Sequence, residues 1–219
     1  MTTLYVALIG DAIASRDLPP PRRARLQRSL RAALPGFNRR WRNSLAARFA
    51  ITQGDELQCL LTHPAPLWEI AHAVRAELAD VDWVIAYGRG PIATPLTPGI
   101  TAPEVDGPCF YAARGAVDDA KRRRLLLAFA GFGDRDPVLN AFASYYSALY
   151  WSWTPRQRAA ARLLRAGAPP PLAARRLRVH RSAISHLGRR MAWPLVALGD
   201  TMFQTLLGGS ASTAAGAAQ

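Results

Sequence analysis

Apolar residues follow two different periods along the first part of the chain. Short runs rich in β-branched and aromatic residues, typical of strands, alternate with segments whose leucines recur every three or four residues, as on a helix face. The elements run in the order β-α-β-β-α-β-α-β, at residues 4–9, 19–34, 49–52, 57–61, 66–78, 81–87, 107–121 and 125–129. This order predicts an α+β domain over residues 1–135, with a ferredoxin-like, palm-type antiparallel sheet and helices on one face.

The pattern becomes wholly helical after residue 135. Thr154-Pro155 predicts a helix start and Gly167 its end, and a third short helix is expected from His180. A short second helix is expected to carry Leu172, Ala173, Arg176 and Leu177, and its small Ala173 favours close helix packing. We expect a helical linker and helix-turn-helix domain over 136–207.

Two features follow the predicted third helix. A stripe of apolar residues is expected in the core or at a homodimer seam: Leu195, Leu198, Met202 and Leu206. The small-residue tail over 208–219 is expected to be disordered.

Charge is distributed unevenly between these parts. Residues 1–150 carry 18 Lys/Arg and 14 Asp/Glu, whereas residues 151–219 carry ten arginines and one acid, Asp200. Such a shift indicates a domain boundary near Tyr145–Trp153 and a polyanionic partner for the second part. A basic surface that only aids solubility explains the charge alone equally well.

The helical pattern favours the polyanionic partner. The spacing T-x-x-Q…L-L-x-x-G…A-x-x-L-x-V-x-x-S-x-I-S-x-L resembles the helix-turn-helix of sigma-factor region-four and LuxR-type regulators. That resemblance implies that the third helix enters the major groove of double-stranded DNA. The expected DNA-binding residues are Arg178, Arg181, Ser182, Ser185, His186, Arg189 and Arg190. The alternative is a packing or dimerisation unit whose arginines are only solvated.

No segment predicts export or membrane insertion. The first apolar run lacks a basic leader and is broken by Asp11, and no apolar stretch reaches the roughly 18 residues that span a bilayer. Cys59 and Cys109 lie in apolar surroundings and match no metal-binding spacing. We expect a cytoplasmic protein with no membrane partner.

Four blocks of the chain carry a family resemblance. L-I-G-D-A-I-A-S, F-A-I-T-Q-G-D-E-L-Q-C-L-L, A-Y-G-R-G-P-I-A-T and D-G-P-C-F-Y-A-A-R-G-A-V resemble the SatD family, small bacterial proteins that end in a helix-turn-helix. The same blocks are similar, more distantly, to the catalytic core of class III nucleotide cyclases.

The cyclase resemblance implies a metal and nucleotide site. Asp11 and Asp55 match two aspartates that hold Mg²⁺ or Mn²⁺ on a nucleoside triphosphate, and Arg114 matches an arginine that clamps phosphate. Four glycines would allow close approach of a nucleotide to the backbone: Gly10, Gly54, Gly88 and Gly90. Without a ligand, Asp11 could cap a turn, Asp55 could serve the hairpin, and Arg114 could pair with Asp118.

The chain also departs from the cyclase pattern. Phe110 replaces the asparagine that precedes the arginine, and Thr52 and Gln53 stand where a base-reading lysine is expected. No catalytic residue is therefore assigned. These departures favour a DNA-binding regulatory protein whose first domain binds a nucleotide with divalent metal. The alternative is a metal-dependent nucleotide cyclase or nucleotidyltransferase regulated by its helix-turn-helix.

Overall fold

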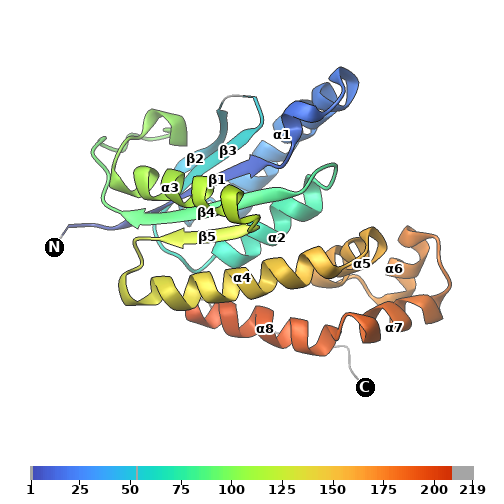
Figure 1. The fold of residues 1–219 in the computed structure, drawn as a ribbon. Helices are drawn as coiled ribbons and strands as arrows, with labels where there is room; N and C mark the ends of the chain where they lie inside the picture. The colour runs from blue at the N-terminus through green and yellow to red at the C-terminus, as the bar shows by residue number, and fades with distance from the viewer. Residues whose placement is uncertain (1, 53, 209–219) are drawn as a thin grey trace. The chain divides into compact units, whose positions relative to one another are not determined.

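The computed structural model describes residues 2–52 and 54–208, which form an α+β structure (Figure 1). The strands are β1 (Tyr5–Ala12), β2 (Leu45–Thr52), β3 (Glu56–Leu61), β4 (Trp83–Gly90) and β5 (Leu127–Ala130). The α-helices are α1 (Pro20–Arg40), α2 (Leu67–Glu77), α3 (Pro108–Arg123), α4 (Asp136–Ser152), α5 (Pro155–Arg165), α6 (Pro170–Leu177), α7 (Arg181–Arg190) and α8 (Trp193–Leu206). The predicted element order of the first part is confirmed.

The chain divides into two compact units. The first consists of Met1–Pro64 and Glu77–Ser147, and the second of Ala65–Ala76 and Ala148–Gln219. Nearly all of α2 therefore belongs to the second unit, together with the helices that end the chain, a grouping that the sequence did not indicate. The predicted disordered tail lies outside the described residues, apart from residue 208.

The sheet of the first unit has the strand order β2-β3-β1-β4-β5. β1 is antiparallel to both β3 and β4, but β5 is parallel to β4. The prediction of a purely antiparallel sheet was therefore wrong, and the sheet is mixed. The reason is the connection: a strand that is followed by a helical crossover returns parallel to its neighbour, and α3 is that crossover.

Helices cover both faces of this sheet, which corrects the prediction of helices on one face (Figure 1). Ala7 and Ile9 of β1 pack in one core with Ala113 and Val117 of α3. On the opposite face Phe49 of β2 contacts α1, where the ring centroids of Phe37 and Phe49 lie 5.6 Å apart. Alternate residues of a strand point to opposite faces, so the buried strands are apolar on both sides.

Gly88 allows α3 to pack closely against β4. A Cβ atom at this position would overlap the carbonyl oxygen of Cys109 and the backbone nitrogen of Ala113, both on α3. At Gly90 a Cβ would lie 3.1 Å from the backbone nitrogen of Cys109. The backbone of α3 therefore rests directly on the backbone of β4, and any side chain at Gly88 would force the two apart.

The second unit is organised around buried aromatic and ionic contacts. The ring centroids of Trp68 and Phe203 lie 4.7 Å apart, which packs α2 against α8. Asp200, the one acid of the basic part, accepts two hydrogen bonds from Arg165, of 2.7 and 3.1 Å. This pairing compensates a mostly buried carboxylate.

One predicted core surface is exposed instead. Val196 and Phe203 form the buried side of α8, whereas the predicted apolar stripe faces solvent, with exposed fractions of 70% for Leu195, 56% for Leu198, 60% for Met202 and 44% for Leu206. The prediction that this stripe is core was therefore wrong, and the dimer seam stays a prediction. None of the described helices combines the length and apolar character needed to cross a membrane.

Gly88→Ala is expected to lower the free energy of unfolding by about 1–3 kcal/mol, because the added methyl group meets backbone that cannot rotate away. Gly115→Ala is the matched control on α3, since its Cβ meets nothing within 4 Å. There the change should raise stability by about 0.5–1 kcal/mol, as alanine favours a helix over glycine. Urea denaturation measures both; equal effects would show that the contact of α3 with β4 is not tight.

Candidate functional site

Five charged side chains meet at one end of the sheet in the first unit. Asp11 on β1 and Glu56 on β3 are direct cross-strand partners, and Asp55 precedes Glu56 in the β2–β3 turn. Arg114 and Lys121 come from α3, seven residues apart and therefore on the same side of the helix. We call these five residues the acid–base cluster.

Glu56 and Arg114 form the tightest pair in the cluster. The Arg114 guanidinium donates to both carboxylate oxygens of Glu56, at 2.5 and 2.7 Å. Thr52 and Gln58 each donate a further hydrogen bond of 2.7 Å to the same carboxylate. Burial would raise the pKa of Glu56, but these hydrogen bonds outweigh burial and hold that pKa below its ordinary value. Glu56 in turn raises the pKa of Arg114.

Asp11 pairs with Lys121, whose Nζ lies 2.8 Å from Asp11 Oδ1. Burial nevertheless raises the pKa of Asp11, and the negative charges of Asp55 and Glu56 add to that rise, while Lys121 lowers it in part. Asp55 accepts a hydrogen bond from the hydroxyl of Ser15. Each of the three acids thus already has a donor from this chain.

The structure brings Asp11, Asp55 and Arg114 together, as their predicted roles require. It also adds two residues that the sequence did not single out, Glu56 and Lys121. Arg114 is bound by Glu56, whereas Asp118, its expected surface partner, affects Arg114 only through its charge. Lys121 is the only lysine of the chain, a signal that was visible in the composition.

Three of the four predicted nucleotide-binding glycines have structural roles. Gly88 and Gly90 admit α3, and Gly54 adopts a φ of +80° that the hairpin turn requires. Gly10 lies on β1 opposite Leu57, with no backbone contact that excludes a Cβ. Their contact with a nucleotide stays a prediction.

A divalent metal would have to displace donors of this chain from the acid–base cluster. Carboxylate oxygens are ligands that Mg²⁺ prefers. Here Lys121 already forms an ion pair with Asp11, and the Ser15 hydroxyl already donates a hydrogen bond to Asp55. Within residues 2–52 and 54–208, no group of three or more His, Cys, Asp or Glu side chains is arranged to hold a metal ion. The Lys121 ammonium group contacts one of the two carboxylates that were predicted to hold a metal, and the metal site stays a prediction.

A second candidate surface lies on α7 in the second unit. All seven predicted DNA-binding residues are exposed there or in the preceding turn: Arg178, Arg181, Ser182, Ser185, His186, Arg189 and Arg190. Ile184 is buried on the opposite side of α7. His180 caps the helix by accepting from the backbone of Ser182, and Arg189 contacts Nδ1 of His186 at 2.8 Å.

The cysteines offer no reactive thiol. Cys59 and Cys109 are both free and buried. Burial raises the pKa of Cys59 well above its ordinary value and that of Cys109 to about 11, so both stay protonated near neutral pH.

Glu56→Gln is expected to lower the free energy of unfolding at neutral pH by about 1–3 kcal/mol, because a charge-assisted pair with Arg114 is lost. The pKa of Glu56 is lowered in the folded state, so its contribution is present above its ordinary value of 4.5 and is lost as pH falls through the folded-state pKa. The difference in the free energy of unfolding between wild type and Glu56→Gln should therefore become smaller at acidic pH. Asp119→Asn, which removes exposed pairs with Arg122 and Arg123, should cost less than about 1 kcal/mol. Urea denaturation at several pH values tests this; a pH-independent difference would contradict it.

Lys121→Ala is expected to create a response to metal that the wild type lacks. Without the ammonium group, the repelling charges of Asp11, Asp55 and Glu56 favour a bound cation, so millimolar Mg²⁺ or Mn²⁺ should raise the melting temperature of the variant. Lys121→Arg keeps the charge and should stay unresponsive. A shift in the wild type that Asp11→Asn abolishes would instead support the predicted metal site.

Comparisons with known proteins complete this description. Two solved structures, each described as a bacterial light-regulated adenylyl cyclase, align with 59% of this chain; one shows 11% identity, a TM-score of 0.39 and 76% coverage of its own chain. The other shows 12% identity, a TM-score of 0.37 and 43% coverage. TM-scores below 0.5 do not show a shared fold. No curated protein matches the chain. The model of the SatD family matches residues 5–154, from β1 to the residue that caps α5, and the chain belongs to the SatD family.

Proposed function

We propose that this protein is a DNA-binding regulator whose α6–turn–α7 segment is a helix-turn-helix. The observation that carries the proposal is the division of α7 into two sides. Every residue expected at DNA is exposed, while Ile184 is packed with Ala173 and Ala174 of α6. A helix that buries one apolar side and presents arginine, serine and histidine on the other can lie in a major groove.

The turn between the two helices supports the same assignment. α6 ends at Leu177, Arg178 adopts the left-handed conformation with φ 52°, and α7 begins at Arg181 after the His180 cap. Three residues therefore separate the helices, which is the length of turn in helix-turn-helix motifs. Ala173 is fully buried at the contact, and its small side chain allows the two helices to approach.

Charge in this region favours a polyanion. Ten arginines lie between residues 151 and 219, and their one acid, Asp200, is already paired with Arg165. The exposed arginines of α7 are therefore not balanced by an acid of the same segment. Phosphate contacts by such arginines supply affinity, and contacts to base edges supply specificity.

In this proposal the first unit is a palm-type domain that binds a nucleotide with Mg²⁺ or Mn²⁺. Its first four strands have the antiparallel order β2-β3-β1-β4, with helices between β1 and β2 and between β3 and β4 along the chain, which is the ferredoxin-like arrangement. A triphosphate that displaces Glu56 from Arg114, and a metal that displaces Lys121 from Asp11, would occupy the acid–base cluster together. Metal alone would not.

Turnover of the nucleotide is not part of the proposal. Arg114 is already held by Glu56, and Phe110 replaces the asparagine expected of a cyclase. No contact in the described residues favours a cyclase or nucleotidyltransferase over a regulator.

Arg181→Ala combined with Arg189→Ala is expected to weaken binding to duplex DNA by about 1–3 kcal/mol for each base contact that is lost. Arg28→Ala combined with Arg31→Ala is the control, because it removes the same charge from exposed positions on α1. Fluorescence anisotropy with a mixed-sequence duplex at several salt concentrations measures both. Wild-type affinity should fall steeply with salt, since phosphate contacts release counterions. No salt-dependent binding by the wild type, or equal losses in both double variants, would refute DNA contact by α7.

A further inference from the structure

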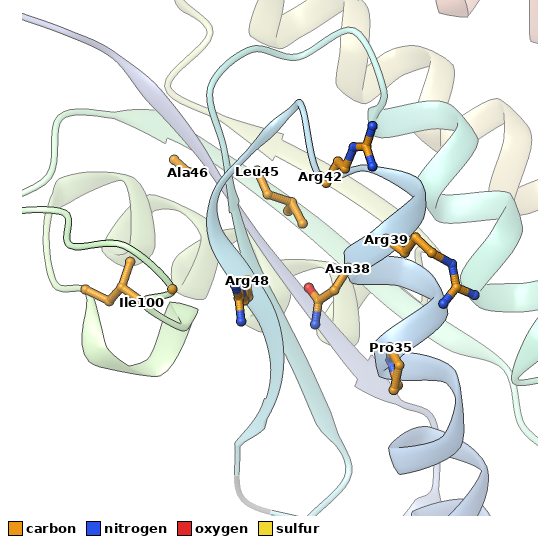
Figure 2. Close-up of a pocket in the computed structure, with 9 residues that line it drawn as sticks. Pro35, Asn38, Arg39, Arg42, Leu45, Ala46, Arg48 and Ile100 are labelled. Atoms are coloured by element: carbon orange, nitrogen blue, oxygen red, sulfur yellow. The ribbon is translucent and has the colours of Figure 1, made fainter.

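A depression in the first unit lies where three segments meet: the end of α1, the start of β2 and the loop at residues 99–100. It encloses about 490 Å³, which is within the range of small-molecule sites. Figure 2 shows Arg48 near its middle, between Asn38 on one side and Ile100 on the other, with Arg39 and Arg42 beyond Asn38. The remaining lining is Pro35, Leu45, Ala46 and Gly99.

The charge of the depression is of one sign. Its titratable lining residues are Arg39, Arg42 and Arg48, and all three are exposed. Among the described ion pairs and hydrogen bonds, none joins these three side chains to a carboxylate. Arg48 lies near the middle of the depression, while the side chains of Arg39 and Arg42 extend from its rim (Figure 2). The depression therefore favours an anionic occupant.

Helix capping explains only part of this arrangement. Arg39 lies in the last turn of α1, where a cation interacts favourably with the helix dipole. Arg42 lies beyond the end of α1, and Arg48 lies on β2, where no helix end requires a cation. The shared feature of the three residues is the depression that they line.

Hydrogen bonds to the backbone hold the walls of the depression in place. Asn38 accepts a hydrogen bond of 2.7 Å from the backbone N–H of Phe49 and donates one of 3.1 Å to its carbonyl oxygen. The backbone N–H of Arg48 donates to the carbonyl oxygen of Ile100 at 2.9 Å, which ties the loop to β2. A pocket whose backbone is set in advance loses less conformational entropy when a ligand binds.

Gly99 lies beside the guanidinium group of Arg48. This glycine has φ +85°, and a Cβ there would lie 3.9 Å from the Arg48 guanidinium carbon. The Arg48 side chain is exposed to solvent. A planar fork of donors in this position suits two oxygens of one phosphate.

We propose that this depression binds a small organic phosphate that carries two or more negative charges, with Arg48 as its central contact. A multiply charged anion balances three arginines better than a single carboxylate. The apolar lining of Leu45, Ala46 and Ile100 faces the organic remainder of the ligand. Because no carboxylate lines the depression, binding needs no divalent metal, in contrast to the acid–base cluster.

The test is isothermal titration of the full chain with pyrophosphate in the presence of EDTA, at physiological ionic strength so that general charge attraction is screened. Wild type is expected to bind, and Arg48→Ala to bind at least about tenfold more weakly, since charge-assisted hydrogen bonds are lost. Arg31→Ala, an exposed arginine of α1 outside the depression, should leave affinity unchanged. The apo melting temperature of Arg48→Ala should match the wild type, because only an exposed side chain is shortened.

Two further measurements distinguish a small organic phosphate from the phosphodiesters of a nucleic acid. Arg39→Ala combined with Arg42→Ala should also weaken pyrophosphate binding. A short single-stranded oligonucleotide, which offers only phosphodiesters, should bind wild type and Arg48→Ala alike. The proposal is overturned if pyrophosphate does not bind, if it binds Arg48→Ala and wild type equally, or if Arg48→Ala weakens only the oligonucleotide. None of these outcomes depends on duplex DNA binding by α7.

Discussion

The direct contact of α3 with β4 is the constraint on which the first unit depends. Gly88 has no side chain, so the backbone of α3 at Cys109 and Ala113 packs directly against the backbone of β4. That contact fixes both the height and the direction of the helix over the sheet. Arg114 and Lys121 are carried by the same helix, and their reach to Glu56 and Asp11 follows from it. A helix raised by one methyl group would hold these cations away from the acids, and both ion pairs would be lost.

The order of strands and helices could be read from the sequence because each element has a clear period and a clear end. Leu26 and Leu30 mark the buried side of α1, and Gly54 marks the hairpin between β2 and β3. Strand direction and layer order could not be read in this way. They depend on which strands become neighbours, and β5 joins the sheet beside β4 through a crossover that local pattern does not reveal. The exposure of Leu195 was missed for a similar reason: a periodic stripe indicates a helix face, but not what covers it.

Candidate site residues could be found where a motif fixes their position. Asp11 lies near the end of β1 and Asp55 follows a hairpin glycine, so their proximity follows from β-pairing. No role was predicted for Glu56 or Lys121, and both were missed. Glu56 becomes the partner of Asp11 only through the register of β1 and β3. Lys121 reaches Asp11 only because α3 packs close to the sheet. The basic side of α7 was accessible to sequence reasoning, because a short amphipathic helix defines its own two sides.

The contact between Trp68 and Phe203 has a consequence for how SatD proteins vary. Trp68 lies within the span matched by the family model, whereas Phe203 lies beyond it, and the two rings pack edge to face. His72 and Asp200 form a second contact across the same boundary, with 3.9 Å between His72 Nε2 and Asp200 Oδ1. Replacement of the final helices by those of a relative should therefore disturb the packing of α2. Substitutions at positions 68 and 72 should covary with those at 203 and 200, and a relative that lacks α8 should carry polar residues on this side of α2.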